Sequence, residues 1–344
     1  MTMSGMNDNN NNNDNDNNNI VLFHYRASPY GRRVTAYLAL RNIPYAECIQ
    51  PPMLPRPDME ALGIKYRRSP VMAIGRDVYV DTRIIITKLE ELFPASSAHP
   101  GLSTPDTIGL ANLLSKFVVD GGVFKRVVSQ IPQDLPMLKD PKWQKDRSEF
   151  RDADQKRNPH LVRPEGTVHL RQCFDIVEAL LADGRMWIGA TPAISLADLE
   201  GAWVLDWFLG DLMPDQAFFS PRHYPKVHAW RSRYSEAVEA AKKRAQKPVR
   251  LQGSQAVEAV TSSGFQDRDL EVDAADPLKL LKGDYVKVFP TDGGGSHQDS
   301  GRLIKLTKDE VAVAVQARSG ADVHIHAPRW AFRVIQANRD GARL

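Results

Sequence analysis

Residues 23–34 read F-H-Y-R-A-S-P-Y-G-R-R-V and join a short apolar run, Ile20–Phe23, to a helical pattern that continues to Leu40. This order predicts a strand, a tight turn and a helix. Ser28 and Pro29 stand at the join, where Ser is a favoured N-cap and Pro a favoured first helical residue. A helix that begins there presents unpaired N–H groups and a partial positive charge, which suit an anion such as a thiolate. The segment alone leaves two interpretations of Ser28 open, a simple helix cap and part of an anion site.

The residues up to Pro94 continue the alternation of strands and helices. The expected elements are a strand at 45–49, a helical turn at 58–63, strands at 70–74 and 77–80, and a helix at 81–93. Gly75 and Arg76, between the two later strands, are typical of a hairpin turn, and Pro94 ends the last helix. The order βαβ followed by ββα requires a parallel strand pair with a right-handed crossover, to which the hairpin adds antiparallel strands.

Beyond residue 105 the apolar pattern has helical spacing. Helices are expected at 106–131 with a bend near Gly121-Gly122, at 164–181, at 199–209 and from Tyr224-Pro225 onward. Ser195 and Asp198 have the spacing of a capping box in front of the third of these helices.

The last hundred residues and the first nineteen differ from the rest. Residues 246–277 are polar and are interpreted as a linker. Alternating runs between Asp284 and Ile335 predict five short strands with tight turns, which are typical of a small SH3-like barrel at 278–338. Residues 7–19 contain only Asn and Asp, and such a tract cannot bury apolar surface, so residues 1–19 are expected to form a disordered tail.

The composition is that of an ordinary soluble globular protein. The chain has 344 residues, which favours two or three domains, and its net charge of +3 gives no overall nucleic-acid footprint. No apolar run approaches the roughly 18 residues of a membrane span. Cys48 and Cys173 lie far apart and are interpreted as buried apolar residues in a reducing compartment, so a cytoplasmic location is expected.

Three short motifs carry a resemblance to a known family. Ser28-Pro29-Tyr30-Gly31-Arg32-Arg33, Ser69-Pro70-Val71 and Asp81-Thr82 together resemble the N-terminal domain of cytosolic glutathione transferases. The segment around Ser195–Asp198 resembles the capping box in the helical domain of the same family. The resemblance implies an α/β thioredoxin-like domain at 20–95 and an all-α domain at 100–245. The small all-β barrel is a part that this family does not usually carry.

The resemblance also implies a role for each matching residue. The Ser28 hydroxyl would hold the thiolate of glutathione, with Tyr25 as the rival activator. Ser69, before a cis Pro70, would bind the cysteinyl part through its backbone, and Asp81 and Thr82 would meet the γ-glutamyl ammonium and carboxylate. The glycyl carboxylate would meet one of five arginines, among which the sequence does not choose: Arg32, Arg33, Arg67, Arg68 and Arg83.

Two functions follow from these observations. The first is a glutathione transferase that activates the thiol for attack on an electrophile between the 26–31 loop and the helix around 112–124. Conjugation, or glutathione-assisted isomerisation or elimination in a biosynthetic pathway, would both use this site, and the resemblance implies a homodimer. No membrane or nucleic-acid partner is expected for such an enzyme.

The second function is a non-catalytic scaffold whose C-terminal barrel binds a protein or a nucleic acid. The segment Ile64–Arg68, which departs from the family pattern, favours this alternative. His324 and His326 share one face of a strand, but no third ligand is evident, so no metal is expected.

Overall fold

The N-terminal strands and helices have the predicted order. The computed structural model describes residues 20–151, 156 and 158–337, so the tail predicted at residues 1–19 lies outside the described residues. The elements are β1 (Ile20–His24), α1 (Pro29–Leu40), β2 (Ala46–Ile49), α2 (Pro57–Ala61), β3 (Val71–Ile74), β4 (Asp77–Val80) and α3 (Thr82–Leu92). β1 pairs with β2 in parallel and with β3 in antiparallel, and β3 and β4 form the hairpin. The thioredoxin-like part of the predicted fold is confirmed.

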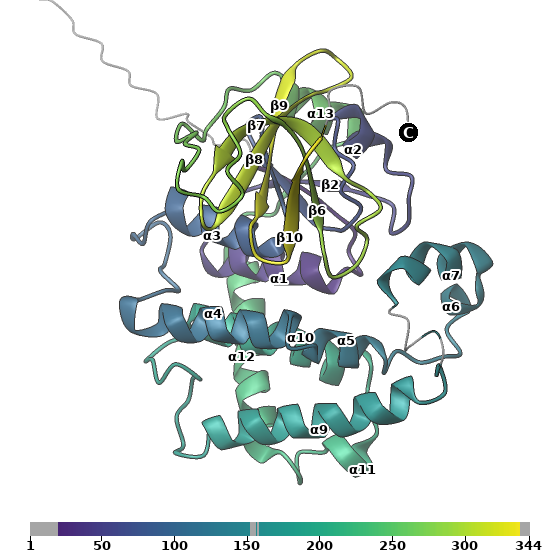
Figure 1. The fold of residues 1–344 in the computed structure, drawn as a ribbon. Helices are drawn as coiled ribbons and strands as arrows, with labels where there is room; N and C mark the ends of the chain where they lie inside the picture. Colours follow the sequence, from purple (N-terminus) through teal and green to yellow (C-terminus); the bar gives the residue numbers. More distant parts are fainter. Residues whose placement is uncertain (1–19, 152–155, 157, 338–344) are drawn as a thin grey trace, which may run out of the picture.

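The next part of the chain is helical and lies below the sheet in Figure 1. Its elements are α4 (Pro105–Val119), α5 (Val123–Val128), α6 (Pro136–Lys139), α7 (Pro141–Arg147), η1 (Ser148–Phe150), α9 (Val162–Leu180), α10 (Leu196–Asp211), α11 (Gln216–Phe219) and α12 (Pro225–Arg244). The predicted bend separates α4 from α5, because Gly122 adopts a φ of +85°, which a glycine tolerates without strain.

The capping box at the start of α10 joins three segments of this helical part. The Asp198 carboxylate accepts hydrogen bonds from the Ser195 backbone N–H at 2.9 Å and from the Ser195 hydroxyl at 2.6 Å. Its other oxygen accepts from the Ile188 N–H at 2.7 Å and from the Trp230 indole at 2.8 Å. A residue predicted as a local helix cap therefore also fixes α12 and the loop before α10.

The α4–α5 segment, Pro105–Val128, is long and apolar enough to cross a membrane by length and composition alone. The sequence analysis found no such run because polar residues interrupt the segment. Ala111, Leu114 and Val118 of α4 are buried in the helical core. Of the most apolar window of this segment 28% is buried, and the segment is divided into two helices at Gly122.

Five strands follow at the predicted places, but they do not close into a separate barrel. They are β6 (Tyr285–Pro290), β7 (Asp299–Leu306), β8 (Glu310–Gln316), β9 (Asp322–Pro328) and β10 (Phe332–Gln336). β9 pairs in parallel with β4, so that Val78 lies beside Ile325. The strands of the described residues form one open sheet of ten strands in the order β10-β6-β7-β8-β9-β4-β3-β1-β2-β5. The predicted all-β part is present, and it extends the N-terminal sheet.

The segment interpreted as a linker contains structure of its own. β5 (Val249–Arg250) pairs in parallel with β2, and α13 (Gly253–Thr261) packs near α2. Phe265 forms a bridge to Gly75 in the β3–β4 turn. Residues beyond 245 therefore pair with both edges of the four N-terminal strands: β5 pairs with β2 at one edge, and β9 pairs with β4 at the other.

Two clusters of apolar side chains fill the interior. One combines Leu22, Val34 and Ile85 with the core of the helical part. The other lies on the opposite face of the N-terminal strands and is shared with the C-terminal strands. It includes Val21, Phe23, Leu62, Val71, Val78 and Val80 from the first part and Val286, Leu303, Val313, Ile325 and Val334 from the last. Successive side chains along these strands therefore point alternately into one cluster and into the other.

Asp299 of β7 is a buried carboxylate at this shared interface. Its Oδ1 accepts a hydrogen bond from the Lys65 backbone N–H at 2.6 Å, yet burial raises the pKa of Asp299 from 3.8 to about 6. The folded state therefore binds a proton more readily than the unfolded state. The ionised group destabilises the fold by about 3 kcal/mol well above pH 6, and this penalty shrinks as the pH falls from 7 toward 4.

We expect Asp299→Asn to raise the unfolding midpoint at pH 7.5, because the amide has no ionised form to bury. The gain over the unsubstituted protein should diminish as the pH is lowered to 5, which thermal unfolding at a series of pH values would measure. Asp309→Asn, the same change at an exposed position of the neighbouring turn, is the matched control and should show no such pH dependence. A gain that does not vary with pH would contradict the assignment.

Candidate active site

The strand register brings the three motifs to one end of the sheet. Phe23 lies beside Val71, and Val71 lies beside Val80. The turn after β1, the residues before β3 and the residue after β4 are therefore neighbours, although Ser28 and Asp81 are 53 residues apart along the chain. Ser28, Ser69-Pro70 and Asp81-Thr82 occupy these three places.

Ser28 is the N-cap of α1, as predicted. Its Oγ accepts a hydrogen bond from the Gly31 backbone N–H at 3.1 Å, and its own N–H donates to the Tyr25 carbonyl at 2.9 Å. The side chain is buried beneath the first helical turn. Because Oγ accepts the capping bond, its hydroxyl hydrogen remains available to donate to an anion at the helix N-terminus.

Ser69 and Pro70 are joined by a cis peptide bond, as the resemblance implied. A second cis bond joins Leu54 to Pro55. The Ser69 hydroxyl oxygen is buried and has no hydrogen-bond partner among residues 20–151, 156 and 158–337. An unpaired polar atom in such a position is costly unless a ligand or water satisfies it.

Asp81 and Thr82 form the start of α3. Asp81 has a φ of +83°, and its carboxylate accepts hydrogen bonds from the N–H and the Nε of Arg83, both at 3.0 Å. Burial opposes ionisation of Asp81, but the Arg83 guanidinium and these hydrogen bonds hold its pKa below the ordinary value. The Thr82 hydroxyl accepts from Arg33 at 2.7 Å. Both residues are at the predicted place, and each already has a partner within the protein.

The five arginines that the sequence could not distinguish all have acidic partners. Arg32 pairs with Asp211, Arg33 with Glu200, Arg67 with Asp146 and Glu149, Arg68 with Asp292, and Arg83 with Asp81 and Asp120. Arg68 also donates to the Gly293 carbonyl at 2.5 Å, so the loop between β6 and β7 reaches the candidate site. Sequence reasoning missed this loop because it lies more than 200 residues from Arg68.

Tyr30 and Tyr66 are two site residues that sequence reasoning did not assign. Burial raises the pKa of both phenols, and the charge of the Asp81 carboxylate adds to the effect. The position of Tyr30 within S-P-Y-G, directly after the capping residue, was the available hint. Tyr25, the rival activator, belongs to the same turn, and its phenol acts on Arg56: burial lowers the pKa of the Arg56 guanidinium, and the Tyr25 phenol partly offsets this.

Aromatic rings line the side of this site that faces the helices. Tyr30 lies 4.6 Å from Phe124 and 4.9 Å from Trp203, measured between ring centroids. Phe124 also contacts Trp207 at 6.0 Å. The contact between Tyr30 and Phe124 joins the two segments between which the sequence analysis expected an electrophile to lie.

Below these rings a buried ion pair fixes α1 to α10. Arg33 lies 2.5 Å from the Glu200 carboxylate and also donates to the Ser115 hydroxyl at 2.9 Å. The side chains of Arg33 and Glu200 are only 1% and 4% exposed. Removing one member of such a pair leaves an uncompensated buried charge.

We expect Glu200→Leu to lower the free energy of unfolding by about 3 to 5 kcal/mol, because it strands the Arg33 guanidinium. Adding Arg33→Leu should recover part of the loss. Asp206 lies on the same helix as Glu200 and forms a partly exposed pair with Arg231 of α12, so Asp206→Ala is the matched control and should cost about 1 kcal/mol or less. Equal losses for Glu200→Leu and Asp206→Ala in chemical denaturation would contradict this account.

Two family models match parts of this chain. Residues 22–97 match the family described as Glutathione S-transferase, N-terminal domain, and residues 126–243 match a domain of unknown function (DUF7962). No curated protein matches the sequence. Residues 22–97 therefore form a glutathione S-transferase N-terminal domain, and the chain has a glutathione transferase-like fold. Its particular form joins a glutathione S-transferase N-terminal domain to a helical part and to a sheet extension that continues the N-terminal strands.

Two solved structures with TM-scores above 0.5 support the same fold. A GST-like protein from Pseudomonas syringae is 21% identical, with a TM-score of 0.70 over 93% of this chain and 100% of that chain. The β-etherase LigF from Sphingobium sp. strain SYK-6 is 13% identical, with a TM-score of 0.51 over 66% of this chain and 99% of that chain. A rice glutathione S-transferase solved with glutathione is 16% identical, with a TM-score of 0.48 over 67% of this chain and 92% of that chain. Since 93% of this chain is covered, the match to the Pseudomonas structure extends into the C-terminal strands.

Proposed function

We propose that the protein binds glutathione at the end of the sheet formed by Ser28, Ser69-Pro70 and Asp81-Thr82, and activates its thiol for attack on an electrophilic small molecule. The observation that carries this proposal is the convergence of two helix N-termini, α1 and α3, on one cis-proline turn. Such termini attract anions through their unpaired N–H groups and their partial positive charge.

Ser28 is the residue to which we assign thiol activation. The free thiol of a cysteine has a pKa near 8.5, so it is mostly protonated at neutral pH. A hydroxyl donor together with a helix N-terminus stabilises the thiolate and lowers that pKa. A serine does not form the mixed disulfide that a cysteine would, so this site favours addition of the thiolate to an electrophile over thiol exchange.

Arg68 is the residue to which we assign the binding of a carboxylate group of glutathione. Its charge acts on Tyr66 and Asp81, and its present partner is Asp292, whose side chain is 42% exposed. A ligand carboxylate would take the place of Asp292 and form the same charge-assisted hydrogen bonds. Arg33 is less suited, because Glu200 and Thr82 already bind it in the buried interface.

The electrophile would lie against the Tyr30, Phe124 and Trp203 rings, which are close to Ser28 along α1 and face the helical part. Flat apolar walls with a few polar groups are usual in small-molecule sites. Conjugation of an aromatic electrophile, or a glutathione-assisted isomerisation or elimination, would use the same surface. A homodimer in the cytoplasm, as the resemblance implies, is part of this proposal, and light scattering of the purified protein would measure its mass.

The test of the proposal is binding and turnover together. The purified protein should be retained on glutathione-agarose, released by free glutathione, and should conjugate glutathione to an aromatic halide. Retention without turnover over a panel of electrophiles would leave only a binding function. Failure of both would overturn the proposal.

A scaffold without catalysis is the second candidate, and one observation favours it. Asp81 and Thr82 already have partners in Arg83 and Arg33, and the loop that carries Asp292 and Gly293 holds Arg68. In this alternative the C-terminal strands would present a surface to a protein or nucleic-acid partner. Calorimetry distinguishes the two, because a scaffold whose groups are satisfied internally gives no heat with glutathione.

A further inference from the structure

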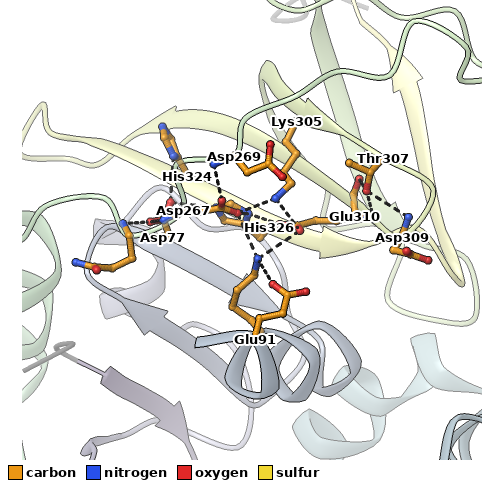
Figure 2. A network of polar contacts seen from close by, with 12 residues as sticks. Asp77, Glu91, Asp267, Asp269, Lys305, Thr307, Asp309, Glu310, His324 and His326 are labelled. Atoms are coloured by element: carbon orange, nitrogen blue, oxygen red, sulfur yellow. Dashed lines mark hydrogen bonds and ion pairs between the residues drawn. The ribbon is translucent and has the colours of Figure 1, made fainter. Parts of the chain in front are cut away.

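The junction of β4 and β9 brings together a set of side chains that the proposed glutathione site does not use. Asp77 of β4 lies beside His324 of β9 in the parallel register, and His326 follows two residues later on the same face (Figure 2). His324 Nδ1 and His326 Nε2 each lie 3.1 Å from the same oxygen of Asp77. The sequence offered two histidines without a third ligand, and the strand pairing supplies it.

Asp77 differs from the acidic residues around it in its ion-pair partners. Asp267 lies 2.9 Å from Lys305, and Glu310 lies 3.2 Å from Lys305 and 3.7 Å from Lys88. Asp77 is fully buried, and among the described residues its ion-pair partners are only the two histidines. A buried carboxylate without a lysine or arginine must be balanced by an imidazolium or by a metal ion.

The surroundings hold each of the three side chains in place. His326 Nδ1 lies 2.6 Å from Glu310 Oε1, so that Nδ1–H can donate to this carboxylate while Nε2, on the Asp77 side, serves as the metal ligand in the neutral ring. The other oxygen of Asp77 accepts backbone N–H groups of Gln266 and Asp267 at 2.5 and 2.9 Å. A carboxylate behind the histidine ligand is the usual support of a metal-bound imidazole.

Aromatic rings fix the two imidazole planes. The Phe265 ring stacks on His324 with centroids 3.8 Å apart, and the Tyr79 ring stacks on His326 at 4.7 Å. The three ligand atoms of Asp77, His324 and His326 lie within 4.8 Å of one another. Ligand atoms about 2.0–2.2 Å from a tetrahedral zinc ion lie about 3.3–3.6 Å apart, so the set needs little rearrangement to close around an ion.

We propose that Asp77, His324 and His326 bind a divalent metal ion of the zinc class at the junction of the N-terminal and C-terminal strands. Two imidazoles and one carboxylate are ligands that zinc prefers, and a three-residue set leaves one position for water. The second acidic set, Asp267, Glu310 and His326, is less suited because Lys305 already balances its carboxylates. An ion at this place would bind residues 77 and 324–326 together, so it would stabilise the attachment of the C-terminal strands.

The experiment is a metal analysis of the 344-residue protein prepared without a histidine tag. We expect about one zinc ion per chain, loss of that ion with a lower unfolding midpoint after chelation, and recovery of the midpoint when zinc alone is added back. His324→Ala should lower the zinc content about tenfold or more. His160→Ala, at an exposed histidine, and Lys305→Met, which removes an ion pair of the same network but no ligand, should keep the metal.

Three results would overturn the proposal. One is a zinc content that is negligible in the unsubstituted protein and does not rise when zinc is titrated into it. Another is an unfolding midpoint that added zinc leaves unchanged. The third is a bound ion that survives His324→Ala in folded protein. The titration uses the unsubstituted chain, so the proposal stays testable even where a variant does not fold. Without zinc binding, an imidazolium at His326 would balance Asp77.

Discussion

A chain that ends at Ala245 is expected to aggregate or remain unfolded, although it contains both the thioredoxin-like and the helical parts. Truncation removes β5–β10 and exposes one whole face of the N-terminal strands, including Val21, Phe23, Val71 and Val78. Each buried aliphatic or aromatic side chain contributes about 1.5 to 3 kcal/mol, so the loss over this face is on the order of 10 to 20 kcal/mol. That equals or exceeds the whole stability of a typical domain.

Soluble yield, size-exclusion chromatography and thermal unfolding would measure this effect. A chain that ends at Ala337 keeps every described strand and is the matched control, which we expect to fold normally. If the chain ending at Ala245 folded cooperatively and bound glutathione, the C-terminal strands would be an independent appendage, and the shared core would not be needed.

Ser28→Ala is expected to lower kcat/KM for glutathione conjugation by about 100-fold or more, with a smaller effect on glutathione affinity. The reason is that the hydroxyl donor acts on the thiolate, and loss of one such donor to a developing or bound anion costs about 10²- to 10³-fold in rate. The pH dependence should change with it, because the bound thiol would titrate closer to its free value near 8.5. Initial rates with an aromatic halide between pH 6 and 9 measure both effects.

Tyr25→Phe is the matched control for this assignment. It removes a phenol hydroxyl from the same turn, and we expect a nearly unchanged rate because Tyr25 lies near Arg56. The opposite pattern, with activity lost in Tyr25→Phe and kept in Ser28→Ala, would assign thiol activation to Tyr25. Alanine at position 28 also removes the capping acceptor, so a thermal unfolding curve has to accompany the rates.

The sequence predicted the features that depend on neighbouring residues. The strand β1, the cap at Ser28, the hairpin at Gly75-Arg76 and the capping box at Ser195–Asp198 all follow from local turn and cap chemistry, and the structure has them. The cis bond before Pro70 followed from the resemblance, since local sequence gives cis proline only a small prior.

The features that the sequence did not predict depend on distant pairs. The pattern of β9 alternates as a half-buried strand should, but nothing local shows that its partner is β4. The polar composition of 246–277 hid β5 and α13, because a two-residue strand and a short helix need few apolar positions. The acidic partners of Arg32, Arg33 and Arg68 and the approach of Asp77 to two histidines have the same origin, since more than a hundred residues separate the members of each pair.

The coverage of β2 by β5 and of β4 by β9 has a consequence for how the protein folds during synthesis. The strand β4 is complete at Val80, but its partner β9 is complete only at Pro328. At about 5–20 residues per second, ribosomes need roughly 12 to 50 seconds for that interval. During this time the hairpin leaves the ribosome with an open, apolar strand edge, which is a template for pairing with other chains. We expect the nascent chain to depend on chaperones until the last strands emerge, and refolding in vitro to be slow because the decisive contacts have a large sequence separation.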